Sequence, residues 1–202
     1  MKDVTMKLMP LMNMSNTFKL LAAIALASQI SACVPVVVGG AAAGGAMAAD
    51  RRTTGVYIED QNIELKAAQK ISANLPDTAH INITSYKGNV LLTGEVADDA
   101  SKAKTESLVK AIENVTNINN ELVIGVKTSL SSRTNDAYLT SKIKTQFLSE
   151  NRFQANLVKV ITENTVVYLM GYVTQKEAEA AVEIARNTHG VSKVVKIFKY
   201  MP

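Results

Sequence analysis

Two stretches of the chain share one pattern, VLLTGEV at residues 90–96 and VYLMGYV at residues 167–173. Apolar residues alternate along both stretches, which predicts a β-strand in each. A short polar segment precedes each strand, at residues 87–89 and 163–165, so each strand should be the second arm of a hairpin. The glycine within each strand predicts that another backbone or a helix approaches closely at that point.

The similarity extends in both directions, so the chain contains an internal repeat. Asp60 corresponds to Asp136 at a separation of 76 residues, and the hairpin strands correspond at 77. One additional loop residue in the second copy explains this change of separation. A second loop difference restores the separation of 76 residues from the pair Val115 and Val191 onward. The matching apolar pairs are Ile63 and Leu139, Ile71 and Phe147, Ile83 and Val160, Val90 and Val167, Leu92 and Leu169, and Ile118 and Val194.

Periodicity predicts the element order α-β-β-α-β in both copies. Thr174 and Glu177 have the spacing of a capping box, which marks the start of a helix. The expected elements are helices over 61–74 and 98–113 with strands over 80–86, 90–96 and 117–126, then helices over 136–149 and 174–188 with strands over 157–162, 166–173 and 191–200. We therefore expect an α+β fold with two domains, 59–128 and 135–202. Each should be a small mixed three-stranded sheet with two helices on one face.

This order, with the two hairpin stretches and the return strands that begin at Val115 and Val191, resembles the BON domain of bacterial periplasmic and envelope proteins. The resemblance implies a non-enzymatic protein that binds anionic phospholipids, such as phosphatidylglycerol and cardiolipin, through the first helix of its second domain. It also implies a role in outer-membrane integrity, with links to division sites and envelope stress. In the family an aromatic residue lies at the start of that helix, and Tyr138 occupies this place here.

The N-terminal segment has the features of a secretory signal peptide, assigned to residues 1–32. Lys19 precedes an apolar run over 20–27, which is shorter than the roughly 20 residues needed to span a bilayer. The segment Ile30-Ser31-Ala32-Cys33 resembles the lipobox of bacterial lipoproteins, which implies that Cys33 carries acyl chains such as palmitate. The alternative is an ordinary signal peptide followed by an incidental cysteine. Cys33 is the only cysteine, so no disulfide forms within the chain.

Residues 33–58 are expected to form a flexible, lipidated tether, because the uncharged stretch over 34–49 is rich in glycine and alanine. Gly40 and Gly44 form a G-x-x-x-G spacing, which leaves membrane insertion of this stretch as an alternative. An aspartate directly after the acylated cysteine would resemble an inner-membrane retention signal, but this position holds Val34. The expected location is therefore the outer membrane, facing the periplasm.

Charge is distributed unevenly between the two copies. Without residues 1–32 the chain has 19 basic and 17 acidic residues, an excess too small to indicate nucleic-acid binding. Residues 60–128 contain 7 basic and 9 acidic side chains, whereas residues 135–202 contain 9 and 6. The second copy should therefore be the one attracted to an anionic surface.

The expected helix over 136–149 contains the candidate phospholipid-binding residues. Leu139, Ile143 and Phe147 should face the core, which places other side chains outward. The outward candidates are Tyr138, Lys142, Lys144, Thr145 and Leu148. A phenol suits the membrane interface and lysines suit headgroup phosphates. The alternative is an ordinary solvated helix.

No pattern in the sequence indicates catalysis, a cofactor or a metal centre. His80 and His189 lack neighbouring ligands at metal-binding spacing and are interpreted as surface or capping residues. The chain contains no G-x-S-x-G motif. The second functional hypothesis is a protein-interaction module that docks an outer-membrane assembly factor or a cell-wall component, with lipid binding incidental.

Overall fold

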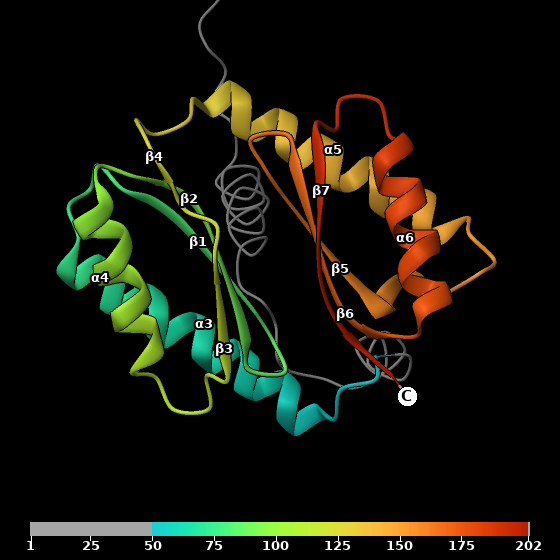
Figure 1. Ribbon diagram of the computed structural model, residues 1–202, viewed down its shortest axis with the longest axis horizontal. Coiled ribbons are helices and arrows are strands. Elements are labelled where there is room, and N and C mark those ends of the chain that lie inside the picture. Colours follow the sequence, from blue (N-terminus) through green and yellow to red (C-terminus); the bar gives the residue numbers. More distant parts are fainter. Residues whose placement is uncertain (1–49, 202) are drawn as a thin grey trace, which may run out of the picture. The chain divides into compact units, whose positions relative to one another are not determined.

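The computed structural model describes residues 50–201, and the two copies of the repeat fold as predicted into two α-β-β-α-β domains (Figure 1). The signal peptide, Cys33 and the glycine-rich stretch over 34–49 lie outside the described residues. The first domain comprises α3 (Thr54–Asn74), β1 (His80–Tyr86), β2 (Asn89–Val96), α4 (Asp99–Lys110), β3 (Asn117–Asn120) and β4 (Val123–Ile124). The second comprises α5 (Leu130–Leu148), a 3-10 turn (Ala155–Leu157), β5 (Val158–Glu163), β6 (Val166–Val173), α6 (Gln175–Asn187) and β7 (Lys193–Tyr200).

Both sheets are mixed and have the hairpin strand β2 or β6 at their centre. β2 pairs antiparallel with β1, placing Ile83 opposite Leu92, and pairs parallel with β3. β6 pairs in the same way with β5 and β7. The last strand of the first domain is interrupted, because the Asn120 side chain accepts a hydrogen bond from the Leu122 amide at 3.3 Å. The predicted strand over 117–126 is therefore two short strands, β3 and β4, which both pair with β2.

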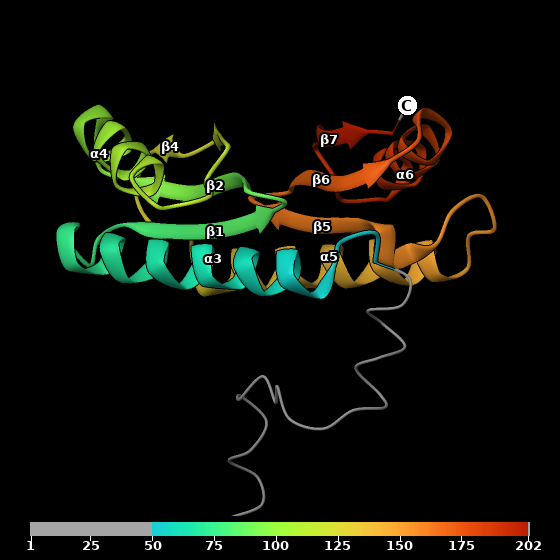
Figure 2. The same cartoon turned by 90° about the horizontal axis from the view of Figure 1, so that it is seen from below.

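Each domain has its own aliphatic core between its sheet and its helices. Ile63, Ala67 and Ile71 of α3 are buried against the first sheet, and Leu139, Ile143 and Phe147 of α5 are buried against the second. These apolar residues of α5 are the ones predicted to face inward. Figure 1 shows α3 and α4 on one side of the first sheet and α5 and α6 on one side of the second, and Figure 2 shows the two domains from below.

Two helices begin earlier than predicted. α3 begins at Thr54, where the Thr53 hydroxyl accepts a hydrogen bond from the Val56 amide, so residues 54–58 are helix although they were assigned to the tether. α5 begins at Leu130, capped by Ser129, instead of at residue 136. Both predicted starts lay two or three residues before the first apolar core residue, Ile63 or Leu139. Each capping residue lies seven or eight positions before the predicted start, about two turns of helix, and most residues of these added turns are exposed or half-buried.

The helix-free faces of the two sheets pack against each other. Both repeats belong to one compact unit, and a third apolar cluster combines Tyr86 and Leu91 with Tyr168, Met170 and Ile197. β2 is buried along its whole length, since Val90 and Leu92 face its own helices while Leu91 faces the other domain. The domains are also joined by an ion pair between Lys159 and Glu64, with a nitrogen–oxygen distance of 2.9 Å.

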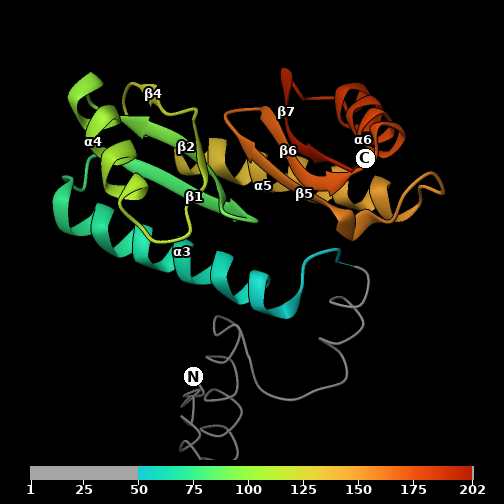
Figure 3. The same cartoon turned by 60° about the horizontal axis from the view of Figure 1, so that its bottom comes forward.

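The segment that precedes α3 contacts both domains (Figure 3). Arg51 donates two hydrogen bonds to the Glu177 carboxylate, at 2.7 and 2.8 Å, and a third to the Tyr172 carbonyl. Arg52 forms an ion pair with Asp60 at 3.0 Å, and its guanidinium carbon lies 4.4 Å from the ring centroid of Tyr86. The chain is therefore fixed at residues 51 and 52, within the range assigned to the tether.

Buried aspartates support the hairpin turns in both domains. Asp60 accepts hydrogen bonds from the amides of Lys87 and Gly88, at 2.8 and 3.0 Å. Asp136 accepts two 2.8 Å bonds from the amides of Asn164 and Thr165. Both turns contain residues with positive φ, a conformation in which consecutive amides point to one side and need an acceptor.

The mid-strand glycines lie against neighbouring backbone, as predicted. A Cβ atom added at Gly94 would lie 2.0 Å from the His80 carbonyl oxygen, and one added at Gly171 would lie 2.5 Å from the Leu157 carbonyl oxygen. Gly94 also has a φ of +113°, which side-chain-bearing residues rarely adopt.

Candidate membrane-contact face on helix α5

The outward face of α5 contains most of the predicted lipid-contact residues. The buried residues Asp136, Leu139, Ile143 and Phe147 define the inward side. Tyr138 and Leu148 are 61% and 77% exposed, and Lys144 and Thr145 are exposed as well. At 100° per residue, Tyr138, Thr145 and Leu148 project away from the buried side, so the structure brings these three onto one solvent-facing surface.

Lys142 lies at the flank of this face and is half-buried. Its ammonium nitrogen is 6.0 Å from the ring centroid of Tyr138, at the outer limit of a cation–π contact. The Thr145 hydroxyl donates to the Ser141 carbonyl at 2.9 Å, so this side chain is partly satisfied within the helix. Lys142 and Lys144 thus lie on opposite sides of the surface that contains Tyr138, and they present two cations with an aromatic ring between them.

The structure adds one residue that sequence reasoning missed. Leu130, the first residue of α5, is 77% exposed. Its helical angle matches that of Leu148, so both leucines lie on the outward side, separated by about 27 Å of helix axis. The expected helix began at residue 136 and therefore excluded Leu130. The Ser129 capping residue was the signal that would have included it.

The outward face therefore combines three apolar or aromatic groups with lysines and small hydroxyl residues. Such a composition suits a helix that lies in a membrane interface, where apolar groups enter the acyl boundary and lysines contact phosphates. Within residues 50–201, no helix has the length and hydropathy needed to cross a bilayer.

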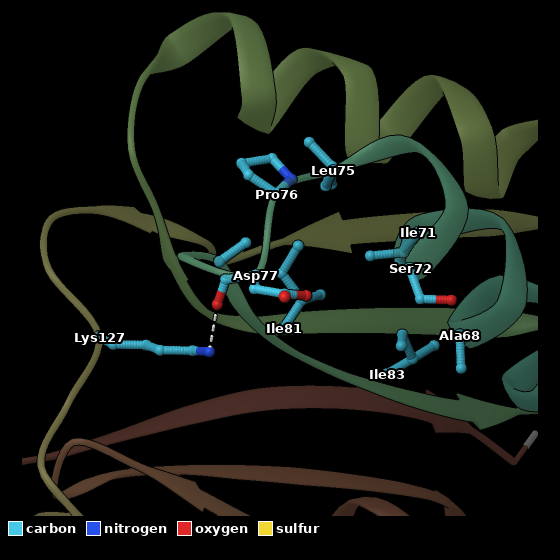
Figure 4. Close-up of a pocket in the computed structure, with 10 residues that line it drawn as sticks. Ala68, Ile71, Ser72, Leu75, Pro76, Asp77, Ile81, Ile83 and Lys127 are labelled. Atoms are coloured by element: carbon cyan, nitrogen blue, oxygen red, sulfur yellow. Dashed lines mark hydrogen bonds between the residues drawn. The ribbon is translucent and has the colours of Figure 1, made fainter.

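A separate apolar pocket lies in the first domain, between the C-terminal end of α3 and strand β1 (Figure 4). Its volume is about 300 Å³, and the side chains that line it include Ile71, Leu75, Ile81 and Ile83. Lys127 closes one side by donating a hydrogen bond to the Asp77 carbonyl. Most of the residues that line the pocket are aliphatic.

Comparison with known proteins agrees with this architecture. The BON domain family model matches residues 59–126 and 135–202. The outer membrane lipoprotein DolP of Haemophilus influenzae is 38% identical over 174 residues, covering 85% of this chain and 90% of that protein. A 21 kDa hemolysin of Actinobacillus pleuropneumoniae is 36% identical, covering 75% of this chain and 79% of that protein. The osmotically-inducible protein Y of Escherichia coli is 29% identical, covering 69% and 72%.

The two family matches coincide with the two domains of the structure, and the first of these relatives aligns across both. This chain therefore belongs to the BON-domain family, as a dual-BON, outer-membrane-anchored lipoprotein similar to DolP.

Proposed function

We propose that the protein, anchored through acylated Cys33, binds anionic phospholipids such as phosphatidylglycerol and cardiolipin through the outward face of α5. In this way it supports outer-membrane integrity, with links to division sites and envelope stress. The observation that carries the proposal is the exposure of Tyr138 and Leu148 beside Lys142 and Lys144 on a single helix face. Membership of the BON family supports a binding role in place of a catalytic one.

The acyl anchor and the helix contribute differently to membrane binding. Acyl chains supply about 0.8 kcal/mol for each buried methylene group and do not discriminate among headgroups. Each lysine close to an anionic surface contributes about 1 kcal/mol and does discriminate. Because the anchor keeps α5 near the leaflet, weak headgroup binding acts at a high effective concentration.

Vesicle flotation tests the α5 face without the anchor. Both cores consist of residues from 63 onward, so a chain that begins at Val34 retains every residue of those cores. We expect this unacylated chain to float with phosphatidylglycerol vesicles. With phosphatidylcholine vesicles it should remain unbound at the bottom of the gradient. Tyr138→Ala with Lys142→Glu should abolish flotation while circular dichroism stays unchanged.

A matched double variant on the other long helix serves as the control. α3 exposes Leu65 next to Lys66, which resembles the Tyr138 environment in exposure and charge. Leu65→Ala with Lys66→Glu should leave flotation intact. Equal losses in both double variants would assign binding to general charge and reject α5 as the site.

The anchor has its own test. Mass spectrometry of the mature protein should find acyl chains on Cys33, and Cys33→Ser should release the protein from the outer-membrane fraction. An unacylated mature protein in the periplasmic fraction would contradict the proposal.

A protein-interaction module is the second candidate function, and the exposed Ile58 and Leu65 of α3 favour it. They are 50% and 58% exposed and lie seven residues apart on one side of that helix. Apolar residues at this i, i+7 spacing are typical of a helix that docks into a groove of a partner protein. Crosslinking in the envelope should then capture an outer-membrane assembly or cell-wall factor. Ile58→Ser with Leu65→Ser would abolish that crosslink and leave flotation unchanged.

A further inference from the structure

Three metal-ligand side chains from both domains meet near the start of β1. His80 begins β1 and pairs directly with Glu95 of β2, while Glu163 ends β5 in the second domain. His80 Nδ1 lies 3.2 Å from Glu95 Oε2 and 3.9 Å from Glu163 Oε1. The three possible donor atoms lie within 4.8 Å of one another. The strands thus place an imidazole and two carboxylates around one point.

The two carboxylates are deeply buried, and within residues 50–201 neither forms an ion pair with a lysine or an arginine. Glu95 is 3% exposed and Glu163 is 6% exposed. Both face His80, whose Nδ1 carries at most one proton and can donate to only one of them. The Glu95 Oε1 atom is buried and accepts no hydrogen bond. Two buried anions that share one imidazole nitrogen are costly unless a further cation is present.

Neutral groups hold the outer side of each carboxylate. Thr128 donates to Glu95 Oε2 from its amide at 3.1 Å and from its hydroxyl at 3.2 Å. Asn82 and Thr93 donate to Glu163 Oε2, at 2.7 and 3.2 Å. Such supporting hydrogen bonds orient the carboxylate ligands of protein metal sites. They fix the two oxygens without neutralising either charge.

An adjoining cavity gives access to the cluster. It has a volume of about 470 Å³, and its lining includes His80, Glu163, Thr140 and Arg133. Arg133 directs one guanidinium nitrogen to the Thr128 carbonyl at 3.0 Å. The remaining lining groups include hydroxyls and amides, so the cavity can hold water next to the cluster. A metal ion therefore has an entry path and a place for a water ligand.

We propose that His80, Glu95 and Glu163 form a divalent-cation site, of the Zn²⁺ type, that joins the two domains. Zn²⁺ takes imidazole nitrogen at about 2.0–2.1 Å and carboxylate oxygen at about 2.0–2.2 Å. Tetrahedral ligands at those lengths are about 3.4 Å apart, within the range of the two distances measured from His80. One imidazole with two carboxylates favours Zn²⁺ over Mg²⁺ and Ca²⁺, which prefer sites made entirely of oxygen.

The sequence could not indicate this site from spacing. The ligands come from three strands and two domains, and Glu163 follows His80 by 83 positions. His80 was interpreted as a surface or capping residue, whereas its side chain is only 15% exposed and contacts two glutamates. Packing of the two sheets creates the cluster.

Isothermal titration with Zn²⁺ alone tests the proposal on the chain that begins at Val34. We expect one Zn²⁺ per chain, with at least tenfold weaker binding after His80→Ala or Glu163→Gln. Glu163→Gln keeps an oxygen that accepts from Asn82 and Thr93, so it removes charge with little change in packing. Zn²⁺ should raise the melting temperature of the parent chain, and Mg²⁺ and Ca²⁺ should not.

The chain offers a matched control in its second histidine. His189 is exposed and lies in the second domain, so His189→Ala should leave the affinity and stoichiometry unchanged. Co²⁺ substitution adds a readout independent of stability, because a bound tetrahedral ion produces visible absorption that His80→Ala should remove. Absence of saturable Zn²⁺ binding, or binding that survives His80→Ala, would overturn the proposal.

Discussion

Asp60 and Asp136 occupy equivalent places in the two domains, each buried beneath a hairpin turn whose amides it accepts. Asp60 has two additional partners, the Ser85 hydroxyl at 2.6 Å and the Arg52 guanidinium at 3.0 Å. Burial alone would raise the pKa of Asp60, but the hydrogen bonds from Gly88, Ser85, Lys87 and Arg52 outweigh it and lower the pKa. Asp60 is therefore ionised and serves as the acceptor of a whole turn.

Replacing either aspartate should destabilise its domain. Asp60→Ala leaves two backbone amides, a hydroxyl and a guanidinium without their acceptor, at a cost of about 3 kcal/mol or more. Asp136→Ala frees two amides and should cost about 1–3 kcal/mol. Urea denaturation measures both values. Asp77→Ala, at an exposed position, is the control, and an equal cost there would contradict the assigned role.

Gly94→Ala should be the more damaging of the two mid-strand glycine substitutions. The new methyl group would overlap the His80 carbonyl, and alanine would have to adopt a φ of +113°, which together cost about 3 kcal/mol or more. Gly171→Ala meets the Leu157 carbonyl at 2.5 Å and should cost about 1–3 kcal/mol. The melting temperatures of the two variants in thermal unfolding measure which substitution is more destabilising. Gly125→Ala has no atom within 4 Å of the added carbon and should be neutral.

Acid should weaken the contact between Arg51 and Glu177. The hydrogen bonds from Arg51 lower the pKa of Glu177 from 4.5 to about 2. A carboxyl with a lowered pKa contributes stability that is complete above pH 4.5 and lost as the pH falls toward 2. Glu177→Gln keeps an acceptor for the Thr174 amide and removes the charge, so it should remove about 1 kcal/mol of this acid-sensitive stability.

Urea unfolding at several pH values between 2 and 6 measures the effect of Glu177→Gln. Glu179→Gln, on the same helix and exposed, should retain the parent pH dependence. Identical pH profiles for Glu177→Gln and the parent chain would show that the ion pair does not contribute.

Lysines on α5 should matter for lipid binding only while salt does not screen them. Lys144→Gln should weaken binding to phosphatidylglycerol vesicles about fivefold at low ionic strength, which corresponds to about 1 kcal/mol. The difference should disappear near 1 M salt, where the Debye length is about 3 Å. Lys176→Gln removes an exposed lysine from α6 of the same domain. An equal loss there would indicate attraction to the whole domain instead of to α5.

Periodicity was sufficient to predict the fold of each domain, because the residues that make each core recur within one helix or strand. It was not sufficient to predict how the domains meet. Alternation along β2 assigns Val90 and Leu92 to one face and leaves Leu91 on the other, yet all three are buried. The second face is covered by Tyr168 and Met170 from another copy of the repeat, and no local pattern encodes that contact.

The same limit applies to the candidate functional residues. Tyr138 and Leu148 were identified correctly as outward residues, because their positions follow from the buried residues of their own helix. Leu130 was missed because the capping residue sets the start of the helix. The cluster of His80 with Glu163 was missed because its members meet only after the two sheets pack.

Arg51 and Arg52 also determine how far the domains can travel from the membrane. They fix the chain directly after Asp50, which follows Cys33 by seventeen positions. Seventeen residues have a contour length of at most about 60 Å. With Cys33 acylated as proposed, the backbone at Asp50 lies within about 60 Å of the leaflet, and a longer segment between residues 33 and 50 would lower the effective concentration of α5 at the membrane surface.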